Sequence, residues 1–302
     1  MLALVVIMSA CNEPNVIASN SNFEGHTAGL PSPLFDSTPA WSPDGTTIAF
    51  HNNGYFYAPD AEGGYGRHLD SMGIWFIAPD GSDKRMFLPG AFEPAWGPQG
   101  KWLVFNYGSQ IFKIMANGDS LTQLTFEGAN FFPAISPDGN AIAYDSNVDD
   151  SFYASSIYDV WVMDADGSNK VNISAGQGGR RPRWSPDGNR IAHERANPVT
   201  ETDIYTMDKS GSQATFLSPG RAARYSPDGT QIAFMYEWQI WLMNTTGGNQ
   251  IQLTFDTGSE PSWSPDGRQI VYYGPQKTLW IMDSDGLNNR QLTFPPDSLS
   301  SN

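Results

Sequence analysis

The sequence predicts an all-β fold, a six-bladed β-propeller with four antiparallel strands in each blade. Two observations lead to this prediction. A turn motif of the form Trp-Ser-Pro-Asp-Gly occurs six times along the 302 residues, and a strand-like Ile-Trp-x-Met stretch follows each copy. A repeat of roughly 40 residues built from short strands is typical of propeller blades. The six copies of the turn motif end at Gly45, Gly100, Gly139, Gly188, Gly229 and Gly267.

The turn motif contains the residues that a tight link between antiparallel strands needs. Proline presets φ at the second turn position, serine or aspartate caps the turn, and glycine accepts a positive φ at its exit. The motif therefore joins the first strand of each blade, such as the one ending at Trp41, to a second strand, such as residues 48–50. The large residue ahead of each turn is expected to pack between neighbouring blades.

The Ile-Trp-x-Met stretch supplies the third strand of each blade, and a Gln-Leu-Thr stretch supplies the fourth in most of them. No segment between these motifs has the period of an amphipathic helix. The six predicted third strands are 74–77, 111–115, 160–163, 204–207, 240–243 and 279–282.

Four segments follow from these patterns. Residues 1–11 resemble a lipoprotein-type signal segment, because an apolar run too short to span a bilayer ends in small residues before the single cysteine, Cys11. Residues 12–38 are predicted to be a solvated leash with a possible extra strand, 39–294 the propeller, and 295–302 a tail. The alternative for the first segment is a cytosolic protein with one free thiol.

The repeated motifs resemble the WD40-like repeats in the propeller domain of TolB and its relatives, over residues 39 to 294. This resemblance implies a periplasmic or cell-surface setting, and with a lipid on Cys11 the chain would be a lipoprotein of the bacterial cell envelope. It does not imply a single function. The α/β domain that precedes the propeller in TolB has no counterpart before Pro39, and the Gly-x-Ser-x-Gly elbow of relatives with a fused peptidase is absent from the sequence.

Composition limits the kinds of partner. There are 17 Lys and Arg against 32 Asp and Glu, a formal net charge of −15. Nucleic-acid binding depends on basic residues that neutralise phosphates, so no nucleic-acid partner is expected. One cysteine cannot form an internal disulfide or a cysteine-rich zinc site. No metal and no cofactor is predicted, and His193 is expected to be a core residue because it aligns with aromatic residues of the other blades.

The two ends of the propeller are expected to differ. The tight turns share one end, the turn face, whereas the links between second and third strands share the other end, the loop face. Longer links at 51–73, 145–158 and 194–202 give the loop face its variation, and binding groups often lie on variable loops of a rigid scaffold. Six aromatic residues in the first two of these links either contact a ligand or pack the loops against the rim of the propeller. They are Tyr55, Phe56, Tyr57, Tyr65, Phe152 and Tyr153.

Six arginines map to the loop face in blades 4 and 5. They are Arg180, Arg181, Arg183, Arg195, Arg221 and Arg224. Arg183 and Arg224 take positions where other blades have alanine or serine, and Glu93 and Glu260 match Arg181 in other blades. We therefore predict that these residues form the mouth of the central channel and bind a carboxylate through guanidinium contacts. The alternative is that the arginines pair internally with Glu93, Glu194, Glu201 or Glu260.

The function predicted from the sequence is a non-catalytic scaffold at the cell envelope that binds a protein or peptide through the loop face and the channel mouth. Its membrane contact would be only through the lipid on Cys11. No catalytic residues are assigned. One alternative is a carbohydrate-active lyase or hydrolase acting on acidic sugars, with His68, loop acids and the arginines. The other alternative is a structural subunit of a surface assembly.

Overall fold

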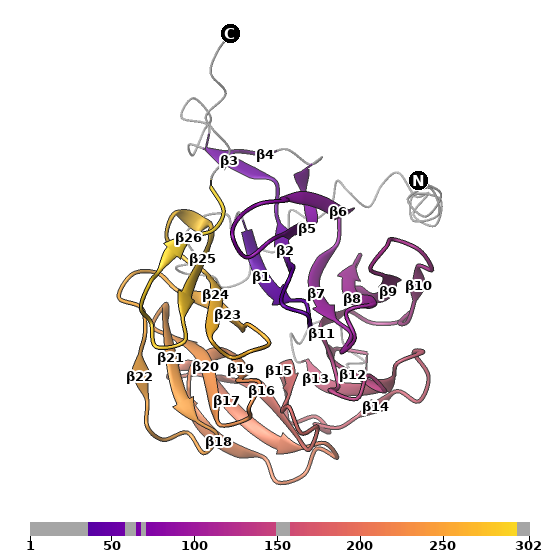
Figure 1. The fold of residues 1–302 in the computed structure, drawn as a ribbon. Coiled ribbons are helices and arrows are strands. Elements are labelled where there is room, and N and C mark those ends of the chain that lie inside the picture. Colours follow the sequence, from indigo (N-terminus) through magenta and orange to yellow (C-terminus); the bar gives the residue numbers. More distant parts are fainter. Residues whose placement is uncertain (1–35, 58–64, 68–70, 149–157, 295–302) are drawn as a thin grey trace.

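A computed structural model describes residues 36–57, 65–67, 71–148 and 158–294. Six four-stranded antiparallel sheets surround a central axis in chain order, from indigo blade 1 to yellow blade 6 (Figure 1). This arrangement confirms the predicted six-bladed propeller. In the described part of the chain, no helix is long and apolar enough to cross a membrane. The lipidation residue Cys11, the loop residues Phe152 and Tyr153, and His68 lie outside the described residues.

Each blade is built from consecutive strands. Blade 1 contains β1 (Asp36–Trp41), β2 (Ile48–Asn52), β5 (Gly73–Ile77) and β6 (Arg85–Pro89). Blade 2 contains β7 (Phe92–Trp96), β8 (Trp102–Tyr107), β9 (Gln110–Met115) and β10 (Thr122–Gln123). Blade 3 contains β11 (Asn130–Ile135), β12 (Ala141–Ser146), β13 (Asp159–Asp164) and β14 (Val171–Asn172).

The second half of the ring repeats this pattern. Blade 4 contains β15 (Arg180–Trp184), β16 (Arg190–Asn197), β17 (Glu201–Asp208) and β18 (Thr215–Pro219). Blade 5 contains β19 (Arg221–Tyr225), β20 (Gln231–Tyr236), β21 (Gln239–Asn244) and β22 (Ile251–Gln252). Blade 6 contains β23 (Ser259–Trp263), β24 (Gln269–Tyr273), the 3₁₀ turn η2 (Pro275–Lys277), β25 (Leu279–Asp283) and β26 (Arg290–Gln291).

The structure changes two of the predicted long loops. The link at 51–73 contains a separate hairpin, β3 (Tyr55–Tyr57) with β4 (Tyr65–Arg67). The link at 194–202 is largely strand, because β16 and β17 pair as far as Asn197 with Glu201. Blade 1 also begins earlier than predicted, since Asp36 and Ser37 pair with β2.

The turn motif works as its residues predict. In the first copy, the Ser42 hydroxyl donates to Asp44 Oδ1 at 2.6 Å and accepts from the Thr47 amide at 2.9 Å. The amide of Gly45, at φ +72°, donates to the Ser42 carbonyl at 2.9 Å. The serine thus satisfies two polar groups that a tight reversal would leave unpaired, which explains why it recurs in five of the six motifs.

The core lies between the blades rather than along the axis. Each second strand buries one large ring, such as Phe105, Phe234 or Tyr144, and His193 takes the same position in blade 4 with 1% of its surface exposed. Desolvation and the nearby Arg195 lower the pKa of His193 to about 4, so its ring is neutral. This burial agrees with its predicted role as a core residue.

Tryptophans of the first strands tie neighbouring blades together. The indole N–H of Trp96 donates to the Ala40 carbonyl at 3.0 Å, that of Trp184 to Ala134 at 3.2 Å, and that of Trp263 to Arg224 at 3.1 Å. Each bond joins one blade to the blade before it, so the large residue ahead of the turn fills the interface and also caps a backbone carbonyl there.

Blade 1 and blade 6 close the ring through side chains, because the four strands of each belong to one continuous stretch of chain. Trp41, Phe50 and Ile77 of blade 1 share a hydrophobic cluster with Leu279 and Ile281 of blade 6. Asp36 is buried at this junction and interacts with Asn52 and with Thr293 beyond β26. The closure is therefore non-covalent and depends on packing and on one buried carboxyl.

Candidate binding site at the channel mouth

A β-bulge in every first strand positions the residues of the channel mouth. The register of pairing shifts at this point in all six blades, and one residue there has a left-handed backbone. The six bulge residues are Thr38, Glu93, Phe132, Arg181, Ala222 and Glu260, with φ between +48° and +56°. Non-glycine residues rarely adopt this conformation, which costs on the order of 1 kcal/mol or more each. The pairing on both sides of the bulge maintains it.

The structure brings Arg181 and Glu260 together across the mouth. Arg181 Nη1 donates to Glu260 Oε1, and Arg181 Nε lies 4.0 Å from Glu194 Oε2. Its guanidinium also lies 4.1 Å above the ring of Phe132. Desolvation lowers the pKa of Arg181, but Glu260 and Glu194 outweigh it and raise the pKa overall. Arg181 is therefore neutralised within the protein, as the internal-pairing alternative expects.

Arg183 and Arg224 differ from Arg181 because their hydrogen bonds go to backbone carbonyls and not to a carboxylate. Arg183 Nη1 donates to the carbonyls of Pro182 at 2.7 Å and Phe132 at 3.2 Å. Arg224 Nη1 donates to the Ala223 carbonyl at 3.2 Å.

Acidic groups lie farther away. Arg224 Nη2 lies 3.9 Å from Glu260 Oε2, and no described carboxylate lies within 4.0 Å of Arg183. Desolvation lowers the pKa of both arginines. The guanidinium of Arg181 lowers the pKa of Arg183 further, and those of Arg183 and Arg181 lower that of Arg224.

Both arginines line a cavity of about 260 Å³ on the axis. Its wall also includes the bulge residues Thr38 and Glu93, and it reaches the turn-face prolines Pro43 and Pro137. The cavity is therefore the central channel, with two guanidinium groups in its wall. Guanidinium groups keep their charge under all ordinary conditions, so this part of the wall is cationic.

The carboxylates around the mouth cap backbone amides of the bulges. Glu93 Oε2 accepts from the Phe132 amide at 2.7 Å, and Glu194 Oε1 accepts from the Ala222 amide at 2.6 Å. Asp145 Oδ2 accepts from the Arg181 amide at 3.3 Å. Each carboxylate belongs to the preceding blade, so these acids hold the bulges in place.

Burial changes the ionisation of these acids. Desolvation raises the pKa of Glu93 to about 7 despite its bond to the Phe132 amide, and raises that of Asp145 to about 6. Glu93 is partly buried and close to half-protonated near neutral pH. Desolvation also raises the pKa of Glu194, whereas at Glu260 desolvation is outweighed by the arginines, Arg181 first, which lower the pKa overall. The mouth therefore has three arginines against three glutamates, of which Glu93 is only partly charged.

The other three predicted arginines are engaged elsewhere on the loop face. Arg180 pairs with Asp145 at 3.3 Å, and Arg221 pairs with Glu201 at 3.1 Å. Arg195 stacks on Tyr205 at 4.7 Å and donates to Gln177 at 3.2 Å. These contacts leave Arg183 and Arg224 as the arginines that face the channel.

Sequence reasoning missed the bulges and Asp145. The bulge residue is not glycine in any blade, and its residue type varies from blade to blade, so the sequence carries no direct signal for it. A proline follows it in five of the six blades. Asp145 and Glu194 both follow the buried ring of a second strand, so alignment of the blades with each other was the available signal. The loop aromatics Tyr55, Phe56, Tyr57 and Tyr65 lie in the β3–β4 hairpin. In the described residues, no three His, Cys, Asp or Glu side chains form a group suited to a metal ion.

Comparison with known proteins agrees with the repeat pattern. An uncharacterized protein of Agrobacterium fabrum is 24% identical over 274 residues, which are 79% of this chain and 84% of that protein. The Tol-Pal system protein TolB of Bordetella pertussis is 34% identical over 128 residues, which are 39% of this chain but only 29% of that protein.

A solved structure shows the same fold. TolB from Acinetobacter baumannii superposes with a TM-score of 0.64 at 21% identity, covering 80% of this chain and 62% of that one. The sequence also matches the TolB beta propeller domain over residues 148–299, which is half of the chain. With its six blades and their repeated turns, the chain belongs to the TolB beta propeller domain family.

Proposed function

We propose that this propeller is a non-catalytic scaffold that binds a protein or peptide partner at its loop face and takes a carboxylate of that partner into the channel mouth. The observation that carries this proposal is the pair Arg183 and Arg224. Both guanidiniums line the channel, and the one described carboxylate within 4.0 Å of either of them, Glu260, is already bonded to Arg181.

An incoming carboxylate would compensate these two charges. Removing a guanidinium from water is unfavourable, and a second guanidinium nearby repels it. Desolvation and the charge of Arg183 therefore both lower the pKa of Arg224. A carboxylate between the two arginines would form charge-assisted hydrogen bonds with groups that now bond only backbone carbonyls. The channel of about 260 Å³ admits a side chain or a chain end, so the rest of a partner would lie on the loop face.

A displayed peptide library tests this proposal. Selection on the immobilised protein should enrich sequences with Asp, Glu or a free carboxyl terminus at one position. Arg183→Gln and Arg224→Gln should each weaken binding of a selected peptide by about tenfold or more, because a bond to a charged group is worth roughly 1.5–3 kcal/mol.

Arg268→Gln is the matched control, because Arg268 is an arginine at the turn face with 86% of its side chain exposed. The affinity of the Arg268→Gln protein for the same peptide should equal that of the unaltered protein. Peptides that bind the two channel variants as tightly as the unaltered protein, or enriched sequences without a shared carboxylate, would contradict the proposal.

We further propose that the protein is displayed at the bacterial cell envelope and that a lipid on Cys11 is its contact with the membrane. Membership of the TolB propeller family and the small residues ahead of Cys11 support this location. Cells expressing the chain with a labelled fatty acid should incorporate the label, and Cys11→Ser should abolish incorporation. Equal labelling of the two forms would exclude lipidation at this cysteine.

A further inference from the structure

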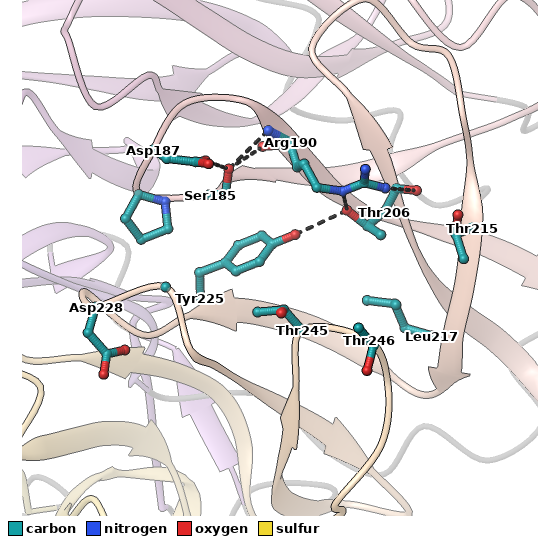
Figure 2. A pocket seen from close by; sticks show the side chains of 12 residues that line it. Ser185, Asp187, Arg190, Thr206, Thr215, Leu217, Tyr225, Asp228, Thr245 and Thr246 are labelled. Atoms are coloured by element: carbon teal, nitrogen blue, oxygen red, sulfur yellow. Dashed lines mark hydrogen bonds between the residues drawn. The ribbon is translucent and has the colours of Figure 1, made fainter.

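A second hollow, drawn in Figure 2, opens between blades 4 and 5 at the turn face. Its volume is about 710 Å³, within the size range of small-ligand sites. At this face the six blades share one turn motif. The pocket shows that the side chains next to those turns are not equivalent.

Two residues of this pocket differ in type from the residues at the same positions in most other blades. Blade 5 has Tyr225 where four other blades have tryptophan, and its hydroxyl lies 3.1 Å from Thr206 Oγ1 instead of capping a carbonyl of the preceding first strand. Thr206 itself stands in the third strand where other blades have Phe76, Val162, Leu242 or Ile281. Smaller, hydroxyl-bearing side chains thus replace the apolar filling of this one interface.

Arg190 provides a cation in the wall of the pocket. Its Nε donates to Thr206 Oγ1 at 3.1 Å, and its Nη2 donates to the Thr206 carbonyl at 3.4 Å. Among the residues that the structure describes, no carboxylate lies within 4.0 Å of its guanidinium. Its terminal Nη1 has no hydrogen bond to a described residue, so one edge of the fork is available to a ligand.

The equivalent interface between blades 2 and 3 shows what is missing. There the cation is Lys113, which stands at the position of Thr206, donates to the Ala165 carbonyl at 3.1 Å and is attracted by Asp166. Asp166 belongs to the second turn of the next blade. In blade 5 the corresponding turn residue is Thr246, which lines the pocket beside Arg190. Arg190 therefore lacks the acidic partner that this position supplies elsewhere in the ring.

Two carboxylates line another part of the pocket. Asp187 and Asp228 cap the turns of blades 4 and 5, and hydrogen bonds from Ser185 and Ser226 lower their pKa values, so both remain ionised. In Figure 2 they lie at one side of the view and the Arg190 guanidinium at the other, with the Tyr225 ring between them. Leu217 adds an apolar patch to the wall.

We propose that this pocket binds a small zwitterion of the amino-acid or dipeptide class. The ligand's carboxylate would bond Arg190 and the Tyr225 hydroxyl, its ammonium group would face Asp187 and Asp228, and its apolar body would lie against Tyr225 and Leu217. This site is independent of the channel mouth, so either proposal can fail without the other.

Calorimetric titration with the dipeptide glycyl-leucine tests the proposal. We expect a Kd on the order of 1 mM, as for a small ligand in an open site. Glycyl-leucine amide lacks the carboxylate and should bind at least about tenfold more weakly. N-acetyl-glycyl-leucine lacks the ammonium group and should also bind several-fold more weakly, since its neutral amide loses the attraction to Asp187 and Asp228.

Two variants preserve the fold because other blades already contain the substituted residue. Arg190→Gln copies Gln231 and Gln269, and Tyr225→Trp copies the tryptophan of four blades and fills the pocket. Each should reduce glycyl-leucine binding at least about tenfold with the thermal midpoint preserved. Arg268→Gln should bind the dipeptide normally, and repeating the titrations with Arg183→Gln as the parent protein keeps carboxylate binding in the channel out of the comparison.

Three results would overturn the assignment. These are the absence of any glycyl-leucine binding by the unaltered protein, equal binding of the dipeptide and its amide, and undiminished binding by Arg190→Gln or Tyr225→Trp. Equal binding of the acetylated dipeptide would refute the role given to Asp187 and Asp228.

Discussion

Replacing Glu93 by glutamine is expected to remove a pH dependence from the stability of the propeller. The carboxyl of Glu93 has its pKa raised to about 7 by desolvation, from an ordinary value of 4.5. The folded protein therefore binds this proton more tightly than the unfolded chain does. Glutamine keeps an oxygen that can accept the bond from the Phe132 amide, so the variant removes the ionisation and preserves the contact.

The raised pKa determines both the sign and the size of the effect. Below about pH 4.5 the carboxyl is neutral in both states and has no influence through ionisation. Between about pH 4.5 and 7 the unfolded chain loses this proton while the folded protein still holds it, so stability falls as the pH rises, and above about pH 7 the loss is complete. A shift from 4.5 to about 7 corresponds to at most about 3–4 kcal/mol. The Glu93→Gln protein should therefore gain stability relative to the unaltered protein as the pH rises from about 5 to about 8.

Denaturant unfolding of both proteins at several pH values measures this difference. Glu201→Gln is the control, because the Glu201 side chain is 83% exposed and its removal should give a difference with little pH dependence. A difference between Glu93→Gln and the unaltered protein that stays constant from about pH 5 to about pH 8 would refute the reasoning. It would mean that Glu93 is ionised in the folded state throughout this range.

Two further predictions concern the scaffold. Gly211→Ala should lower the thermal midpoint much more than Gly118→Ala. Both glycines have φ near +90°, so the backbone strain is similar. A Cβ at Gly211 would lie 1.8 Å from a backbone oxygen, whereas a Cβ at Gly118 would have no atom within 4 Å. Equal losses would show that strain in φ alone matters. Asp36→Ala should lower stability by about 1–3 kcal/mol, because it leaves the Asn52 amide without its partner where the ring closes. Hydrogen exchange should then accelerate in both β1 and β26, and acceleration confined to β1 would argue that Asp36 has no role in closure.

Much of the fold was predictable because its signals are local. The Ser-Pro-Asp-Gly turn is specified by residues within about five positions of each other, as the bonds of Ser42 to Asp44 and Thr47 show. Six copies of a local structure, each with a strand on both sides, leave a ring of blades as the arrangement that buries their apolar faces. The buried position of His193 was predictable for the same reason, since it aligns with the rings of five other blades.

The site depended on contacts that sequence order does not reveal. The sequence grouped six arginines, but packing between blades determines that Arg180, Arg181 and Arg221 pair with acids while Arg183 and Arg224 face the channel. Arg181 and Glu260, for example, are 79 residues apart in the chain. The bulges that turn such side chains toward the axis have a left-handed backbone without glycine, which the surrounding strand pairing and the carboxylates of preceding blades maintain.

The sequence by itself thus determined the number of blades, their strand order and the residues of each turn, because hydrogen bonding and backbone preference act between near neighbours. Only the tertiary structure decided which charges are compensated and where the rings leave space. Those properties depend on distances between blades of a few ångströms, and both the free edge of Arg190 and the opening beside Tyr225 arise from them.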